Sequence, residues 1–176
     1  HASMYLQAGN RHTVKVPFAI ADSGTPTLIR WGMDTAWDDE GNVLRGVNFI
    51  GRDRLTYGRV SFQVMDALNE DGTLSTRQLN YLKNRLRHIS LTHPDGILLN
   101  SDPVDINTEV YTHHPEAWYK VIKATLKYVQ DYGLKVVSIA PFNEPDVTAS
   151  NQGTKADFKA VAKLIKEDPF FEGIRI

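Results

Sequence analysis

The sequence predicts an α/β protein in which helices surround a parallel sheet. Strand-like apolar segments alternate with amphipathic, helix-like segments four times, and a fifth strand begins near residue 173. Each strand–helix repeat takes about 35 to 40 residues, the spacing found in a (β/α)8 barrel. We therefore expect a (β/α)8 TIM barrel, of which this chain supplies about the first four β/α units and the start of strand 5. A doubly wound open sheet is the rival, but no glycine-rich phosphate fingerprint follows the first predicted strand.

The first half of this region contains two predicted strands and two predicted helices. Residues 27–31 and 59–64 have the pattern of strands, and residues 42–50 carry valine and isoleucine at helical spacing. Ser75 and Gln78 form the pattern of a capping box, which marks the start of the second helix. The apolar stripe expected to face the core in that helix is Leu79, Leu82, Leu86 and Ile89.

The second half repeats this order. Buried strands are expected over residues 96–100 and 135–140. Pro115 suits the first position of the helix between them, which ends near Gly133. Thr154 begins a further capped helix. The residues expected to face the core are Val121, Ile122, Leu126 and Val129 in the first of these helices, and Phe158, Val161, Ala162 and Ile165 in the second.

The chain divides into three parts. Residues 1–4 are interpreted as a vector-derived remnant, and residues 5–26 as a lead-in strand region with short apolar alternation. Residues 27–176 are expected to form the N-terminal half of a (β/α)8 catalytic barrel, with 173–176 beginning its fifth strand.

The composition excludes several classes of function. The chain has 176 residues, of which 41% are hydrophobic and 23% charged, and its formal net charge is −1. Near-neutral charge without a basic stripe argues against a nucleic-acid partner and against an anionic membrane surface. No apolar run approaches the ~20 residues of a spanning helix, so no membrane insertion is expected. The chain has no cysteine, which excludes disulfides and thiolate metal sites.

Polar side chains gather where the predicted strands end. In a barrel the active site forms at the carboxyl ends of the strands. Carboxylates and amides bind hydroxyls, and a tryptophan face stacks on a sugar ring, so we expect a polysaccharide or oligosaccharide substrate. The candidate substrate-binding residues are Asn143, Trp37, Asp34, Gln63, Asn100 and Asp102, together with His113 and His114 after the third strand.

Glu144 is the candidate catalytic residue. It follows Asn143 at the end of an apolar strand, and Pro145 disfavours helical backbone at Glu144, which keeps it extended. A carboxyl group in a partly dry pocket near another carboxylate has a raised pKa. Such a group can stay protonated at neutral pH and donate its proton to a glycosidic oxygen, while Asn143 holds the sugar 2-hydroxyl.

These residues also resemble a known family. Asn143-Glu144-Pro145 at the end of a fourth strand resembles the acid/base motif of the clan A retaining glycoside hydrolases. Trp31-Gly-Met-Asp-Thr-Ala-Trp37, followed by Asn42-Val-Leu-Arg-Gly-Val-Asn-Phe-Ile-Gly51, resembles the N-terminal region of glycoside hydrolase family 86. That family contains β-agarases and β-porphyranases, which cut red-algal galactans internally. The resemblance spans roughly Leu28 to Asp146.

The resemblance implies a retaining endo-β-glycosidase that is secreted, periplasmic or on the outer surface and requires no cofactor. It implies that Glu144 is the acid/base and that a second glutamate, at the end of strand 7, is the nucleophile. The chain as written lacks this nucleophile, so by itself it should not hydrolyse a glycan, and we expect the remainder of the same barrel to exist. Many clan A enzymes also place an arginine on strand 2 near the nucleophile, but Arg59 stands at the wrong end of the predicted strand for that role.

Several residues have simpler interpretations. Trp31 lies within a predicted strand and is expected in the core. The acidic run 38–40 suits the dipole of the helix that follows better than it suits calcium. Residues 69–73 lack the later ligands of a calcium loop and are expected to form a surface turn. His114 fits equally well as the cap of the helix that begins at Pro115, and no metal site is expected.

Other function classes stay open. The chain could belong to another clan A glycosidase, xylanase-like or glucanase-like of the family 30 type. It could also be a non-catalytic carbohydrate-binding barrel that keeps the cleft without the chemistry. An aldolase or isomerase barrel would need a lysine or a metal set at the strand ends, and neither is found in this half.

Overall fold

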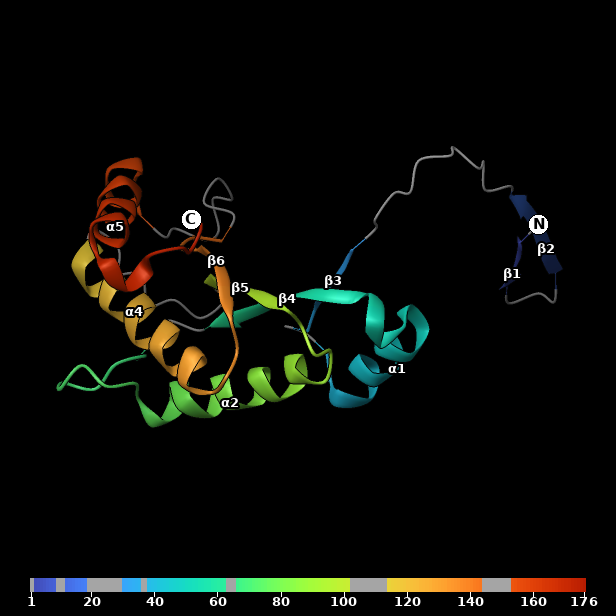
Figure 1. Cartoon of the computed structure of the whole chain (residues 1–176), viewed down its shortest axis with the longest axis horizontal. Helices are drawn as coiled ribbons and strands as arrows, with labels where there is room; N and C mark the ends of the chain where they lie inside the picture. Colours follow the sequence, from blue (N-terminus) through green and yellow to red (C-terminus); the bar gives the residue numbers. More distant parts are fainter. Residues whose placement is uncertain are drawn as a thin grey trace.

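The computed structural model shows two separate sheets and the helices that accompany the larger one (Figure 1). It describes residues 2–8, 12–18, 30–35, 38–62, 66–101, 114–143 and 153–176. The smaller sheet is an antiparallel hairpin of β1 (Ala2–Ala8) and β2 (His12–Phe18), paired from Ala2 opposite Phe18 to Ala8 opposite His12. The lead-in region expected from apolar alternation therefore contains strand β2.

The larger sheet has four parallel strands that lie side by side in chain order. They are β3 (Trp31–Asp34), β4 (Leu55–Phe62), β5 (Gly96–Ser101) and β6 (Val136–Ala140). Near the end of the chain, Arg175 forms a parallel bridge with Ser138 of β6, so the segment expected to begin a further strand does lie beside β6. The predicted α/β class with a parallel sheet is confirmed.

A helix follows each strand of this sheet, because parallel strands need a crossover connection, which is usually a helix. The helices are α1 (Glu40–Ile50), α2 (Thr76–Ser90), α4 (Pro115–Asp131) and α5 (Lys155–Glu167), with short 3-10 turns η1 (Arg52–Arg54) and η2 (Pro169–Phe171). In Figure 1, α5 lies beside α4 at the end of the molecule away from α1. No helix in the described part of the chain is both long and apolar enough to cross a membrane.

The helix starts follow local side-chain chemistry. Asp39 caps α1 by accepting a hydrogen bond from the Asn42 backbone N–H at 2.8 Å, so the acidic run serves the helix as expected. Thr154 and Asp157 form a complete capping box at α5. At α2 only half of the expected box forms. Ser75 accepts from the backbone N–H of Gln78, but the Gln78 side chain is buried instead of turning back to Ser75.

One side of the sheet carries the main core. Apolar side chains of β4, β5 and β6 face the helices and are at most 2% exposed, and they pack against equally buried residues of α2 and α4. The strand residues are Val60, Phe62, Ile97, Leu99 and Ile139, and the helix residues include Leu82, Leu86, Ile89, Val121, Ile122, Leu126 and Val129. A smaller cluster of Val43, Val47 and Leu55 attaches α1 to the sheet. The apolar stripes read from the sequence are therefore largely core, although Leu79, Phe158 and Ala162 are only partly buried.

The other side of the sheet, which we call the open face, is polar and partly exposed. Because side chains alternate along a strand, the residues between the core positions point to this side. The open face carries Asp34, Tyr57, Arg59, Leu98, Asn100 and Ser138. The side chains of Asp34 and Arg59 are 37% and 34% exposed. A parallel sheet is usually covered on both faces. Here the described helices α2 and α4 pack on the opposite face, and on the open face Ser61 and Asn100 are buried while Asp34 and Arg59 are partly exposed.

Two strand predictions need correction. The first strand is β3, which shares only Trp31 with the expected segment 27–31, and residues 27–29 lie outside the described residues. Trp31 was expected in the core but is 48% exposed, because β3 is the edge strand of the described sheet.

The second strand, β4, begins at Leu55, four residues before the predicted start at Arg59. The added residues include Gly58, and a glycine inside a strand often marks a close approach of another element. Here a Cβ atom at Gly58 would lie 2.6 Å from Cδ1 of Ile89, so the glycine allows α2 to approach the strand closely.

We predict that Leu86→Ala lowers the free energy of unfolding by about 2–5 kcal/mol, because it leaves a cavity between α2 and the sheet. A denaturant titration measures the change. The matched control is Asn80→Ala in the same helix, where the side chain is exposed and the expected change is within about 0.5 kcal/mol. Equal effects from both variants would contradict the packing of α2.

Candidate functional site

The described strands bring polar side chains together at their carboxyl ends. Asp34 is the last residue of β3, Arg59 lies on β4, Asn100 lies near the end of β5, and Asn143 follows β6 after three residues. Parallel pairing in chain order places these ends along one edge of the sheet. These four residues, which we call the edge network, are linked by hydrogen bonds.

Arg59 is the centre of the edge network. Its Nη1 donates to Oδ2 of Asp34 at 2.7 Å, forming an ion pair across the β3–β4 pairing. Its Nη2 donates to Oδ1 of Asn143 at 3.2 Å, which reaches past β5 to the residue beyond β6. The register supports this geometry, because Asp34 and Arg59 are directly paired. The positive charge of Arg59 is thus balanced by one carboxylate.

Asn100 is the fourth member of the edge network. Its side chain is only 4% exposed, and its Nδ2 donates to Oδ1 of Asn143 at 3.3 Å and to the backbone carbonyl of Ser101. Asn143 itself is half-buried. The same carbonyl oxygen of Asn143 therefore accepts from both Arg59 and Asn100. A set of amides with a balanced ion pair can bind hydroxyl groups without requiring a charged ligand.

A second polar contact crosses the open face nearer the amino ends of the strands. The hydroxyl of Tyr57 on β4 lies 2.6 Å from Oγ of Ser138 on β6, so the tyrosine spans the intervening strand β5. Gly96, the β5 residue paired with Tyr57, makes room for Val137 of β6, because a Cβ atom at Gly96 would lie 2.6 Å from Cγ1 of Val137. The contact between Tyr57 and Ser138 ties three strands together without touching the edge network.

The structure brings together three of the candidate binding residues named from the sequence, namely Asp34, Asn100 and Asn143. A fourth, His114, is the N-cap residue of α4 just before Pro115, and its side chain makes no capping hydrogen bond. The candidate catalytic residue Glu144 directly follows Asn143 but lies outside the described residues. The remaining candidates, Trp37, Gln63, Asp102 and His113, also lie outside them.

The predicted position of Arg59 was wrong. It was expected at the start of its strand, which is the wrong end for a residue near the site. Because β4 begins at Leu55, Arg59 is the fifth residue of the strand, and its side chain reaches the carboxyl edge. The alternation of Tyr57, Arg59 and Ser61 with Gly58 and Val60 was the signal that could have located it.

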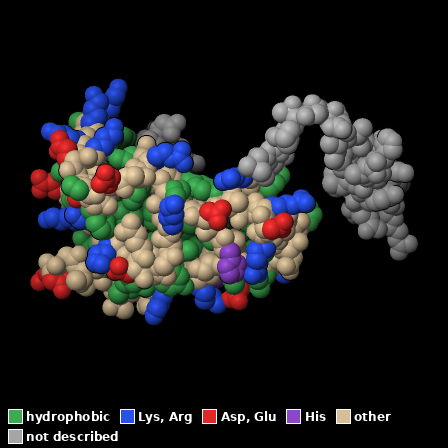
Figure 2. Space-filling model, in the orientation of Figure 1, with side chains coloured by type: hydrophobic (Ala, Val, Ile, Leu, Met, Phe, Trp, Pro, Cys, Tyr) green, Lys and Arg blue, Asp and Glu red, His purple; other side chains and the backbone are tan. Residues whose placement is uncertain are grey.

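No cluster of three or more metal-ligating side chains occurs within the described residues. The acidic run before α1 caps that helix. Residues 69–73 form a turn in which Asp71 accepts hydrogen bonds from both the backbone N–H and the hydroxyl of Thr73, as expected for a surface turn. Acidic and basic side chains are interspersed over the face shown in Figure 2, in keeping with the near-zero net charge.

A second charged cluster lies between α4 and the η2 turn. Asp168 accepts hydrogen bonds from the hydroxyl of Tyr119 and, at 2.6 Å, from Nζ of Lys123, and it also caps η2 through the Phe170 backbone N–H at 3.0 Å. Hydrogen bonds from Lys123, Tyr119 and Phe170 lower the pKa of Asp168 to about 2. Burial, followed by the bond to Asp168, raises the pKa of Tyr119.

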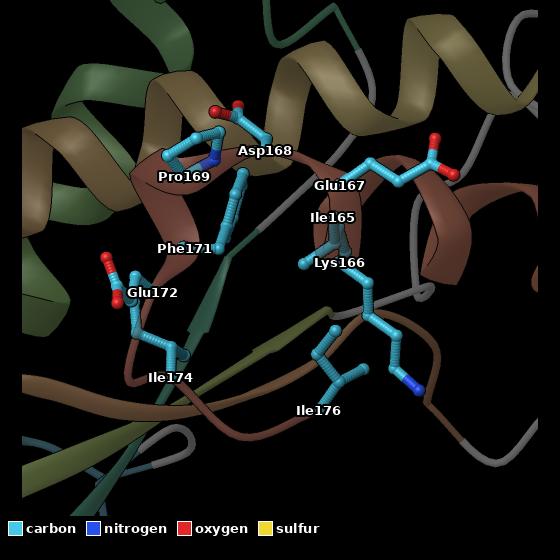
Figure 3. Close-up of a pocket in the computed structure, with 9 residues that line it drawn as sticks. All are labelled: Ile165, Lys166, Glu167, Asp168, Pro169, Phe171, Glu172, Ile174 and Ile176. Atoms are coloured by element: carbon cyan, nitrogen blue, oxygen red, sulfur yellow. The ribbon is translucent and has the colours of Figure 1, made fainter.

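The neighbouring cavity is apolar at its centre. It has a volume of about 430 Å³ and lies between the end of α5, η2 and the segment that follows. Figure 3 shows Ile165, Phe171, Ile174 and Ile176 gathered around it. The carboxylate of Asp168 points away from its centre, toward α4. We interpret this cluster as a structural lock between α4 and α5, because Asp168 accepts hydrogen bonds from Tyr119 and Lys123 of α4 while it caps η2.

Comparisons with known proteins add no assignment to this geometry. No family model matches the chain, and no similar protein was found among curated sequences or solved structures.

We predict that Asp168 contributes stability that is lost in acid. Its folded-state pKa of about 2 lies below the ordinary value of 3.8, so the stabilisation is fully present above about pH 4 and disappears as the pH falls toward 2. Asp168→Asn should therefore be less stable than wild type at pH 7, and the gap should narrow steadily below pH 4. Thermal unfolding across this pH range measures it.

The control for this prediction is Asp131→Asn, which removes the exposed Lys127–Asp131 pair on α4 and should change stability little at any pH. A gap between wild type and Asp168→Asn that does not depend on pH would contradict the assignment.

Proposed function

We propose that this chain is the N-terminal half of the catalytic barrel of a retaining endo-β-glycosidase that hydrolyses a red-algal galactan, agarose or porphyran. Glu144 is the general acid/base, and Asn143 binds the 2-hydroxyl of the sugar whose glycosidic bond is cleaved. The observation that carries the proposal is the edge network, because it assembles hydroxyl-binding groups from all four strands at the carboxyl edge and ends one residue before Glu144. Active sites of β/α barrels form at this edge.

The open face supports the barrel in the proposal. A doubly wound sheet carries helices on both faces, whereas the strands of a barrel turn one face inward and carry helices on the other. The described strands follow chain order without a reversal, and the described helices α2 and α4 pack against one face. Closure into a barrel would cover Tyr57, Leu98 and Ser138 with the inward side chains of further strands.

Apolar groups at both ends of the sheet fit the same proposal. On β3, Trp31 is 48% exposed, and on α1 Phe49 is 91% exposed. At the other end, Ile176 is 48% exposed and lines the apolar cavity. Further β/α units next to β3 and next to Arg175 would bury these side chains, at roughly 25 cal/mol per Å2 of apolar surface removed from water.

The proposed mechanism uses two carboxyl groups. Glu144 first protonates the leaving glycosidic oxygen while a second carboxylate, on a later strand, attacks the anomeric carbon. Glu144 then removes a proton from the water that hydrolyses the covalent sugar–enzyme intermediate. Retention requires the two carboxyl groups to be about 5 Å apart, so the chemistry depends on the rest of the barrel. Asp34 does not serve as the second carboxylate in this scheme, because it is paired with Arg59.

The test is product analysis on agarose, porphyran and xylan with the complete barrel that includes these residues. We expect oligosaccharides from one of the galactans, and we expect Glu144→Gln to lower kcat by about 10²- to 10⁴-fold, the usual contribution of a general acid/base. Glu172→Gln is the matched control, because Glu172 is an exposed carboxylate in the connection that leads from α5 back to the amino end of the sheet.

Each contrary result identifies a different alternative. Products from xylan alone would indicate another clan A glycosidase of the family 30 type. Binding of an oligosaccharide without hydrolysis by any variant would indicate a non-catalytic carbohydrate-binding barrel. Equal activity of wild type and Glu144→Gln would overturn the acid/base assignment.

A further inference from the structure

We propose that Trp118 is a positioning residue for residues 141–143, which lead out of β6 and which we call the exit segment. Its indole N–H binds the backbone carbonyl of Pro141 and its ring packs on the ring of Phe142, so the chain leaves the sheet from a fixed point. The inference rests on the proposed function only for its catalytic consequence, because Glu144 is the next residue in the chain.

The exit segment begins where β6 leaves the sheet. The pairing of β5 with β6 ends at Asn100 opposite Ala140, which is the last residue of β6. Pro141 follows and has no backbone N–H, so its carbonyl is the group through which its backbone can form a hydrogen bond. This carbonyl accepts from Nε1 of Trp118 at 2.9 Å. A helix side chain therefore holds the backbone directly after the sheet pairing ends.

Trp118 is itself held firmly. It lies in the first turn of α4 and is 3% exposed. Its indole N–H can only donate a hydrogen bond, and a buried indole N–H usually has an acceptor. The ring centroid also lies 6.2 Å from that of Phe62, the fully buried last residue of β4. The indole is thus fixed between α4 and the end of β4, and it can orient what it binds.

Phe142 attaches the exit segment to two helices. Its ring stacks on Trp118, with a centroid distance of 5.9 Å and an angle of 21° between the ring planes. On α5 the ring of Phe158 lies 4.1 Å from that of Phe142. Phe158 belongs to the first turn of α5, as Trp118 belongs to the first turn of α4. The starts of both helices therefore contact the exit segment.

The edge network holds the last residue of the exit segment from the strands. Oδ1 of Asn143 accepts from Arg59 of β4 and from Asn100 of β5. All three residues of the exit segment are thus in contact with other elements. Catalytic groups must be held within about 0.5 Å and 10–20° of the productive geometry. Trp118 contributes to this by fixing the exit segment, without any contact of its own with the sugar.

The first measurement is hydrogen exchange of the indole N–H groups in the 176-residue chain. The Trp118 signal is identified by its absence in Trp118→Phe. We expect it to exchange with solvent at least about 100-fold more slowly than the signal of Trp31, which is 48% exposed.

The second measurement is the ¹⁵N order parameter of the backbone N–H groups of Phe142 and Asn143. In wild type we expect values near the rigid limit of about 0.85. Trp118→Phe keeps an aromatic ring but has no donor for Pro141, and Trp118→Leu loses the ring as well. We expect both variants to lower the Phe142 value, and Trp118→Leu to lower it toward about 0.6. If Trp118→Leu does not fold, Trp118→Phe still tests the inference.

The matched control is Val129→Ala, which truncates a fully buried side chain near the other end of α4. It should leave both order parameters unchanged, because it perturbs the packing of α4 away from the exit segment.

The third measurement is the kinetics of the complete barrel on the galactan that it hydrolyses. We expect Trp118→Phe to lower kcat by about 10- to 100-fold, because a displacement of about 1 Å at the reacting groups can cost about 10²-fold. KM should change by less than about twofold, since Trp118 does not touch the sugar, and Val129→Ala should keep both constants. A merely structural role would leave kcat unchanged once the variant is folded.

The outcomes separate this inference from the proposed function. Unchanged order parameters in both Trp118 variants would overturn the inference, as would a Trp118 indole N–H that exchanges as fast as that of Trp31. A looser exit segment in these variants but not in Val129→Ala supports it. If the complete barrel cleaves no galactan, the proposed function fails, and the order parameters still decide whether Trp118 holds the exit segment. A looser segment with unchanged kcat would overturn its catalytic consequence.

Discussion

The parallel pairing of four strands in chain order is the constraint on which the rest of the structure depends. It requires every connection to cross back along one side of the sheet, and apolar side chains of β4, β5 and β6 pack there against α2 and α4. The same pairing collects all carboxyl ends at one edge. Polar residues that are far apart in sequence, such as Asp34 and Asn143, become parts of one hydrogen-bonded group as a result.

Charged side chains serve different purposes in the edge network and in the cluster around Asp168. At the carboxyl edge, Arg59 and Asp34 are each about one-third exposed and form an ion pair, and Arg59 also donates to the amide oxygen of Asn143, the residue before the candidate acid/base. In the second cluster, Asp168 binds Tyr119, Lys123 and the start of η2, so its hydrogen bonds all serve the packing of α4 against α5. The edge network lies at the carboxyl ends of the strands, where residues of β/α folds serve binding and chemistry. The second cluster lies outside the sheet, between α4 and η2, where it serves packing.

The open face links the fold to the proposed function. The described strands pack against helices on one side of the sheet and present Tyr57, Arg59 and Asn100 on the other, which fits the proposed barrel. The open face carries several polar side chains, and the hydrogen bond between Tyr57 and Ser138 pairs two of them. In the proposed barrel these side chains would line the interior below the site. The edge network would then be supported by a packed layer beneath it, as precise positioning requires.

The sequence by itself determined what depends on neighbours along the chain. Apolar periodicity located the helix cores, Asp39 and Thr154 marked helix starts, and the apolar run before Asn143 indicated a buried strand ending in polar residues. Tertiary structure decided what depends on distant residues. Gly58 lies within a strand, where it lets Ile89 of α2 approach the backbone closely. Trp31 is exposed because no described strand lies beyond β3. Gln78 is buried, although the sequence pattern predicted that it would cap the helix together with Ser75. Arg59 joins the candidate site for the same reason: local sequence gives each strand its alternation, but only pairing between strands sets which ends meet.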